Sequence, residues 1–86
     1  MIKKTLYFGN PARLRVKNRQ LLIKREDEED RTIPIEDIGF IILDHYGVTI
    51  SHGALGALME NNTSVITTNE KHMPEGLFLP LAGNSE

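Results

Sequence analysis

Residues 32–83, with the sequence TIPIEDIGFIILDHYGVTISHGALGALMENNTSVITTNEKHMPEGLFLPLAG, decide the fold of this chain. The apolar, β-branched run at 39–43 is typical of a strand that is covered on both faces. A polar loop at 44–47 ends this run, and a second β-branched run follows at 65–68. After it, residues 77–79 form an extended apolar piece between two prolines. The stretch therefore predicts two core strands and an extended exit.

A helix is predicted between these two strands. Ser51 suits the N-cap, because its side-chain oxygen can accept a hydrogen bond from an N–H of the first turn. Asn61 and Asn62 close the helix. Gly53 and Gly56 each weaken it by about 1 kcal/mol relative to Ala, so we expect them where the helix lies close against a sheet. The apolar residues at helical spacing are Ala54, Leu55, Leu58 and Met59.

A β-hairpin is predicted before this stretch, preceded by a first strand at Leu6–Phe8. Residues 13–17 alternate strictly between apolar and basic side chains, and residues 20–25 form the return strand. Asn18-Arg19 serves as a two-residue turn, since Asn tolerates a positive φ. This register pairs Lys17 with Gln20, Val16 with Leu21, Arg15 with Leu22 and Leu14 with Ile23. It places Leu14, Val16, Leu21 and Ile23 on one face and Arg13, Arg15, Lys17 and Lys24 on the other.

The remaining segments complete a single small domain. Residues 26–30 are an unbroken acidic run and are interpreted as a solvated loop. Residues 33–35 alternate around Pro34, which suits an edge or the start of a strand. The predicted fold is mainly β with one α-helix, a small β-sandwich-like domain of about six strands.

Composition excludes several classes of protein. With 86 residues, 40% of them hydrophobic and 26% charged, the chain is a small globular domain. It has no Cys, which excludes disulfides and thiolate metal sites. No apolar run approaches the roughly 20 residues of a membrane span, and no cleavable signal begins the chain. We therefore expect a cytoplasmic protein.

The net charge of -2 conceals a marked asymmetry. The first 25 residues carry eight Lys and Arg and no acid, whereas the other 61 carry two basic residues and all 12 acids. Such a division indicates an anionic partner at the basic end, or alternatively two regions that attract each other. A basic strand face with Tyr7 and Phe8 close by suits a surface that holds phosphates and stacks exposed bases.

No complete catalytic constellation is found. His45, His52 and His72 match no metal-binding spacing, and Asp44-His45 at a strand end is interpreted as a turn element. The sequence holds neither a P-loop nor a Gly-x-Ser-x-Gly motif, and the acidic run lacks the glycine of a calcium loop. A small hydrolase that uses Asp44 and His45 remains a minor alternative.

Taken together, these segments resemble the CRISPR-associated adaptation nuclease, in its type II form, the integrase that inserts new spacers into CRISPR arrays in antiviral defence. The similarity covers essentially the whole chain, and the order and spacing of its pieces carry it. The pieces are Thr5–Pro11, Pro34–Ile38, Leu43–His45, Ser51–Gly53, Glu60–Asn62, Val65–Thr67, His72–Pro74 and Leu77–Leu81.

The resemblance implies that catalysis belongs to a second domain. In that family a small N-terminal β-domain precedes a larger helical domain, which holds the metal-binding Glu, His and Asp of the endonuclease. Residues 1–83 would be the β-domain and 84–86 the start of the linker. No catalytic or metal-binding residue is then expected here, and the Mg²⁺ or Mn²⁺ cofactor would belong to the helical domain.

The resemblance also implies partners. Family β-domains pair into a homodimer, two dimers flank a second small CRISPR adaptation protein, and the domain helps to hold double-stranded DNA of the protospacer and the CRISPR repeat. An aromatic ring can cap the end of that duplex. The candidate stacking residues are Tyr7 and Phe8, and the candidate phosphate contacts are Arg13, Arg15, Lys17 and Arg19. The alternative is a stand-alone protein-interaction module whose basic hairpin meets an acidic partner.

Overall fold

The computed structural model describes residues 2–81 and contains two four-stranded sheets. One sheet, here called the β5 sheet, has the order β1 (Lys4–Phe8), β5 (Ile38–Leu43), β7 (Ser64–Thr68) and β8 (Pro74–Phe78). The other, here called the hairpin sheet, has the order β4 (Arg31–Pro34), β3 (Gln20–Lys24), β2 (Ala12–Lys17) and β6 (Val48–Ile50). A 3-10 turn, η1 (Ile35–Asp37), links β4 to β5, and α1 (His52–Glu60) precedes β7. The predicted fold class, mainly β with one α-helix, is confirmed.

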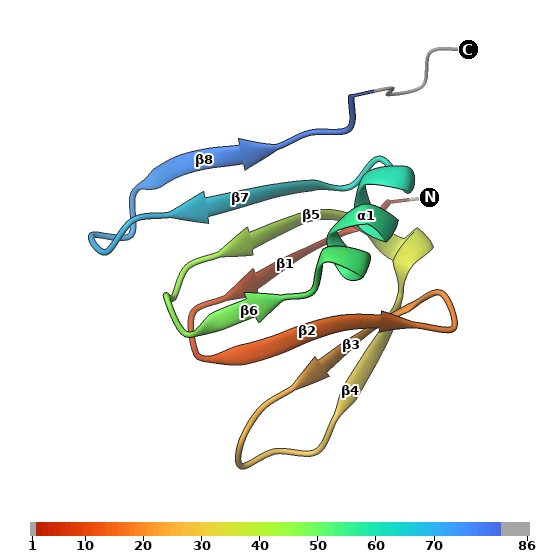
Figure 1. Ribbon diagram of the computed structural model, residues 1–86, viewed down its shortest axis with the longest axis horizontal. Helices are drawn as coiled ribbons and strands as arrows, with labels where there is room; N and C mark the ends of the chain where they lie inside the picture. The colour runs from red at the N-terminus through yellow and green to blue at the C-terminus, as the bar shows by residue number, and fades with distance from the viewer. Residues whose placement is uncertain (1, 82–86) are drawn as a thin grey trace.

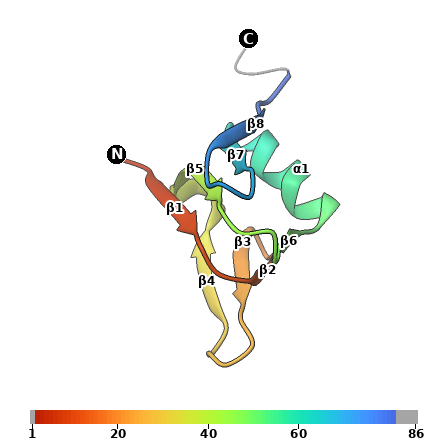
Figure 2. The same cartoon turned by 90° about the vertical axis from the view of Figure 1, so that its left-hand side faces the viewer.

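The two sheets enclose one core with the helix. Figure 1 shows the β5 sheet above the hairpin sheet, and Figure 2 shows α1 and β1 on opposite sides of the molecule. Both sheets and α1 contribute fully buried side chains, such as Leu21, Ile41 and Leu58. Ile41 and Val65 are buried on the neighbouring parallel strands β5 and β7. The prediction that residues 39–43 are covered on both faces is corrected, because Ile42, on the opposite face from Ile41, is only partly buried.

The β2–β3 hairpin has the predicted register. Lys17 pairs with Gln20, and the ladder continues to the pair of Arg13 with Lys24. Asn18 and Arg19 both have positive φ, 54° and 61°, which is the geometry of a type I′ turn. The inner face is buried as expected, with Leu14, Leu21 and Ile23 no more than 5% exposed.

The helix begins and ends as predicted, but its two glycines do not lie against a sheet. Ser51 Oγ accepts a hydrogen bond from the Ala54 N–H at 3.0 Å. Asn61 donates its side-chain amide to the Ile35 carbonyl at 2.9 Å, which ties the helix end to η1. A Cβ added at Gly53 or Gly56 would meet nothing within 4 Å. The expectation that these glycines allow close packing on a sheet is therefore wrong.

The count of about six strands is corrected to eight within residues 2–81. The short strand β6 was not predicted, because its three residues gain their partner only through parallel pairing with Ala12–Leu14. Strand β8 begins at Pro74 rather than at Leu77, and pairs with β7. In this part of the chain no helix is long and apolar enough to cross a membrane. The predicted linker at 84–86 lies outside the described residues.

Candidate nucleic-acid interface

Strand β2 places a row of basic side chains on the outer face of the hairpin sheet. Arg13, Arg15 and Lys17 are exposed, and they alternate with residues whose side chains face the core. Alternate residues of a strand lie about 6.6 Å apart on one face. Arg19, exposed in the hairpin turn, extends the row beyond the strand. The structure thus brings four of the predicted residues onto one hairpin.

The cations at the end of β3 differ from those on β2. Lys24 Nζ lies 3.8 Å from Asp30 Oδ2, and Arg25 Nη1 lies 3.8 Å from Glu28 Oε1. Both pairs are partly exposed, and exposed pairs contribute at most about 1 kcal/mol. Within residues 2–81, no ion pair engages the basic residues of β2 and the turn, namely Arg13, Arg15, Lys17 and Arg19. The acidic loop therefore contacts β3 and leaves the β2 row available.

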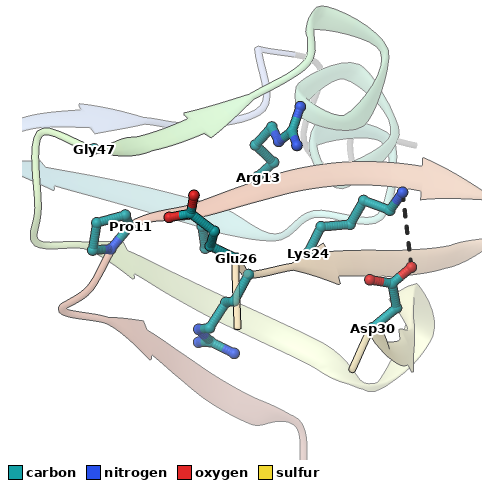
Figure 3. Close-up of a pocket in the computed structure, with 8 residues that line it drawn as sticks. Pro11, Arg13, Lys24, Glu26, Asp30 and Gly47 are labelled. Carbon is teal, nitrogen blue, oxygen red and sulfur yellow. Dashed lines mark ion pairs between the residues drawn. The ribbon is translucent and has the colours of Figure 1, made fainter. Parts of the chain in front are cut away.

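A pocket lies at the open end of the hairpin, where β2 begins and β3 ends. Its volume is about 450 Å³, and Figure 3 shows Lys24 reaching across to Asp30 beside it. Glu26 and Pro11 also line it. Arg13 of the β2 row also lines this pocket, but acids line it as well, so we assign the anion-binding character to the row of Arg13, Arg15 and Lys17 and not to the pocket as a whole.

The two predicted aromatic residues have opposite environments. The Tyr7 side chain is 61% exposed on β1, so its ring is accessible to a partner. Phe8 is only 2% exposed and belongs to the core, with the Arg25 guanidinium 5.7 Å from its ring centroid. The prediction that Phe8 stacks on bases is therefore corrected. The reason is the alternation of β1, which turns neighbouring side chains to opposite faces.

Tyr46 is an exposed ring that sequence reasoning did not select. It is 73% exposed and lies in the tight turn between β5 and β6. The Gly47 N–H donates to His45 Nδ1 at 2.8 Å, which confirms that His45 is a turn element. A Cβ at Gly47 would lie 3.1 Å from Pro11, so this turn packs against the residues that precede β2. An aromatic residue inside the polar run 44–47 was the signal that could have identified it.

Asp44 is the centre of a buried hydrogen-bond cluster. It is 6% exposed and accepts hydrogen bonds from the Thr68 hydroxyl at 2.5 Å, the Tyr7 hydroxyl at 2.5 Å and His72 Nδ1 at 2.9 Å. These bonds, the one from Thr68 foremost, lower the pKa of Asp44 from 3.8 to about 2. The hydrogen bond that the Tyr7 hydroxyl donates to Asp44 raises the pKa of the Tyr7 phenol, because losing the proton would break this bond. The histidine partner of Asp44 is thus His72, not His45.

The histidines do not form a metal centre. Within residues 2–81, no three His, Cys, Asp or Glu side chains gather in a way that could hold a metal ion. His52 is exposed at the start of α1, and His45 and His72 have the hydrogen-bond partners described above. The side chains of residues 2–81 therefore do not offer a set of ligands for the catalytic metal that the resemblance implies.

Comparison with known proteins places the chain in a family. A family model described as "CRISPR associated protein Cas1" matches residues 6–86. The CRISPR-associated endonuclease Cas1 of Neisseria meningitidis serogroup C (strain 8013) is 35% identical over 82 residues, which cover 95% of this chain and 27% of that protein.

Solved structures share the fold. A crystal structure of a TtCas1–DNA complex superimposes with a TM-score of 0.79 at 23% identity, over 96% of this chain and 28% of that one. A partial Cas6-RT-Cas1–Cas2 complex gives a TM-score of 0.80 at 19% identity, over 90% of this chain and 23% of that one. The chain thus spans about a quarter of the length of the relatives that it matches. The family model and the Neisseria relative together show that this chain belongs to the Cas1 family of CRISPR-associated proteins.

Proposed function

We propose that this chain is the non-catalytic DNA-binding and dimerisation domain of a CRISPR adaptation endonuclease that inserts spacers into CRISPR arrays. One observation carries the DNA-binding part: Arg13, Arg15 and Lys17 lie exposed in a row on β2, and none of them has an acidic partner in the described chain. Unpaired surface cations that follow a strand suit the phosphates of a nucleic acid. Membership of the Cas1 family, whose members are CRISPR-associated proteins, supports this proposal.

The expected mode of binding is electrostatic. Each Lys or Arg that neutralises a phosphate releases a condensed counterion, so the affinity falls as the salt concentration rises. Arg19 adds a fourth cation at the turn. The exposed rings of Tyr7 and Tyr46 are the candidates for stacking on a base or a duplex end. A solved Cas1 complex that contains DNA supports this assignment for the family.

Dimerisation is assigned to the outer face of the β5 sheet. Ile42, Ile66 and Leu77 are paired across β5, β7 and β8 and form one in-register apolar row. None of them belongs to the core cluster or packs against it, and Leu77 is 54% exposed. An apolar sheet face of this kind suits a protein partner, here a second copy of the chain.

The remaining assignments belong to the longer protein that the relatives represent. The catalytic residues and an Mg²⁺ or Mn²⁺ ion are proposed to lie in its helical domain. One solved relative is a complex of Cas1 with Cas2, which supports a second small CRISPR adaptation protein as a partner. We propose that this protein acts in the cytoplasm.

A stand-alone interaction module is the second candidate. The ion pairs of Lys24 and Arg25 with the acidic loop show that basic side chains at the end of β3 can bind carboxylates. An acidic protein could therefore occupy the same face. Only the DNA hypothesis, however, gives an affinity for a duplex of arbitrary sequence.

Charge reversal on β2 tests the proposal. The double variant R13E/R15E should abolish binding of a short DNA duplex in a fluorescence anisotropy titration, while the molar mass from light scattering stays that of a dimer. The matched control R31E/K71E makes the same change in net charge at exposed positions outside the β2–β3 hairpin and should retain most of the affinity. Equal losses in both variants would mean that net charge, and not this face, determines binding.

A further inference from the structure

The Asp44 cluster joins the ends of all the strands of the β5 sheet. Asp44 directly follows β5, and its backbone N–H donates to the Phe8 carbonyl at the end of β1. Thr68 is the last residue of β7, and His72 lies in the turn that leads to β8. One residue therefore connects four strands at the same edge.

Tyr7 is the member of this cluster that reaches the surface. Its hydroxyl is fixed by Asp44 Oδ2, while its ring lies so close to Gly9 that an added Cβ there would be 2.8 Å from Tyr7 Cε2. The side chain is nevertheless 61% exposed. A ring held at its tip and along its edge loses little rotamer freedom when it binds, which favours affinity.

The surroundings of this ring suit an anionic partner. Lys4 is exposed at the start of the same strand, Lys3 is exposed directly before it, and no acid occurs in the first 25 residues. The charge of Asp44 is buried and engaged by three side-chain donors. Three residues, 9–11, connect β1 to the basic strand β2. A base could therefore stack on Tyr7 while the adjoining cations hold phosphates.

We propose that Asp44 is a positioning residue that holds the Tyr7 ring in place as a preformed stacking surface for a nucleic-acid base. His72 and Thr68 hold the carboxylate in the orientation that the Tyr7 hydroxyl requires. This inference rests on the proposed DNA-binding function. It goes beyond it by assigning a role to a buried acid that touches no DNA.

The hydrogen bond between the Tyr7 hydroxyl and Asp44 can be tested without DNA. The chain has two tyrosines, so the variant Y46F leaves Tyr7 as the only phenol that titrates. We expect its tyrosinate absorbance to rise at a higher pH than the value of about 10 for a free phenol, and we expect Y46F/D44N to return it toward 10. Circular dichroism at each pH confirms that the fold persists. If the tyrosinate absorbance of Y46F/D44N rises at the same pH as that of Y46F, the hydrogen bond between Tyr7 and Asp44 is overturned.

The positioning role is tested with four variants and a short blunt-ended duplex. Y7A should weaken binding about fivefold or more, the lower range of base–aromatic stacking. Y7F retains the ring and loses only the hydroxyl, and it should weaken binding about threefold, as should D44N. The double variant Y7F/D44N should bind no worse than either single variant, because both remove one interaction. Should D44N fail to fold, Y7F alone carries the test.

The outcomes of these experiments distinguish the proposed DNA-binding function from the positioning role of Asp44. If Y7F and D44N bind as the unaltered chain does while Y7A is weakened, Tyr7 touches DNA and the positioning role is overturned. If R13E/R15E loses binding and Y7A does not, the proposed function stands and this inference falls. If R13E/R15E also binds normally, the proposed function fails and the DNA role of Tyr7 fails with it, whatever the titration shows.

Discussion

The basic row on β2 and the Asp44 cluster are two opposite uses of charge in one small domain. Arg13, Arg15 and Lys17 are exposed and form no ion pair within the described chain. Asp44 is buried and accepts hydrogen bonds from three side chains. The difference shows that charges without partners are available for binding, whereas a fully satisfied charge holds strands together. The first region should therefore affect affinity with little effect on stability, and the second should affect both.

The largest expected effect lies on the inner face of the same hairpin. Leu14→Ala removes a side chain that is 1% exposed and should lower the free energy of unfolding by about 2–5 kcal/mol, because it leaves a cavity in the core. Urea denaturation followed by circular dichroism measures this loss. A change below about 1 kcal/mol would mean that the hairpin sheet does not pack as described.

The next effect is the acid response of the Asp44 cluster. The folded pKa of Asp44 is about 2, below its ordinary 3.8, so the unfolded chain binds the proton more readily. The stabilisation from this group is complete above about pH 5 and is lost progressively as the pH falls from 5 toward 1. We expect the melting temperature of D44N to fall less over this interval than that of the unaltered chain. Parallel curves would show that Asp44 has no depressed pKa.

Arg19 offers a test in which stability and affinity move in opposite directions. It has a φ of 61°, a left-handed conformation that costs a non-glycine residue about 1 kcal/mol or more. R19G should therefore raise the free energy of unfolding by about 1 kcal/mol and weaken DNA binding, because one cation is lost. Denaturation and anisotropy on the same preparation measure both quantities. A variant that is more stable and binds as tightly would remove Arg19 from the interface.

The smallest effect on stability is expected for the basic row itself. R13A and R15A remove exposed side chains without ion pairs in the described chain, so each should change the free energy of unfolding by no more than about 0.5 kcal/mol. Urea denaturation provides the measurement. A larger loss would show that these residues contribute to the fold, and any loss of DNA affinity could not then be assigned to the contact alone.

Sequence reasoning succeeded where local patterns determine structure. The alternation at 13–17 and the Asn18-Arg19 turn together fix the hairpin, its register and its basic face. It failed where partners come from distant parts of the chain. The strand β6 exists only through pairing with β2, and the contact of His72 with Asp44 joins residues 28 positions apart.

The aromatic residues show the same limit within the candidate site. Tyr7 and Phe8 are neighbours in sequence, and only the structure shows which of them faces the core. Tyr46 and Asp44 could be located as a polar turn after β5, but their roles depend on what the fold places around them. Local pattern therefore predicted that the candidate cations are exposed together on one hairpin, whereas tertiary contacts decide which aromatic rings are accessible.

The salt dependence of DNA binding tests the central claim most directly. We expect the logarithm of the affinity to fall linearly with the logarithm of the salt concentration, with a slope of about -0.9 for each phosphate neutralised. The variant R13A/R15A should reduce the magnitude of this slope by about 2, since two phosphate contacts are lost, while the control R31A/K71A leaves it unchanged. An identical slope in R13A/R15A and the unaltered chain would show that the β2 row does not contact the DNA backbone.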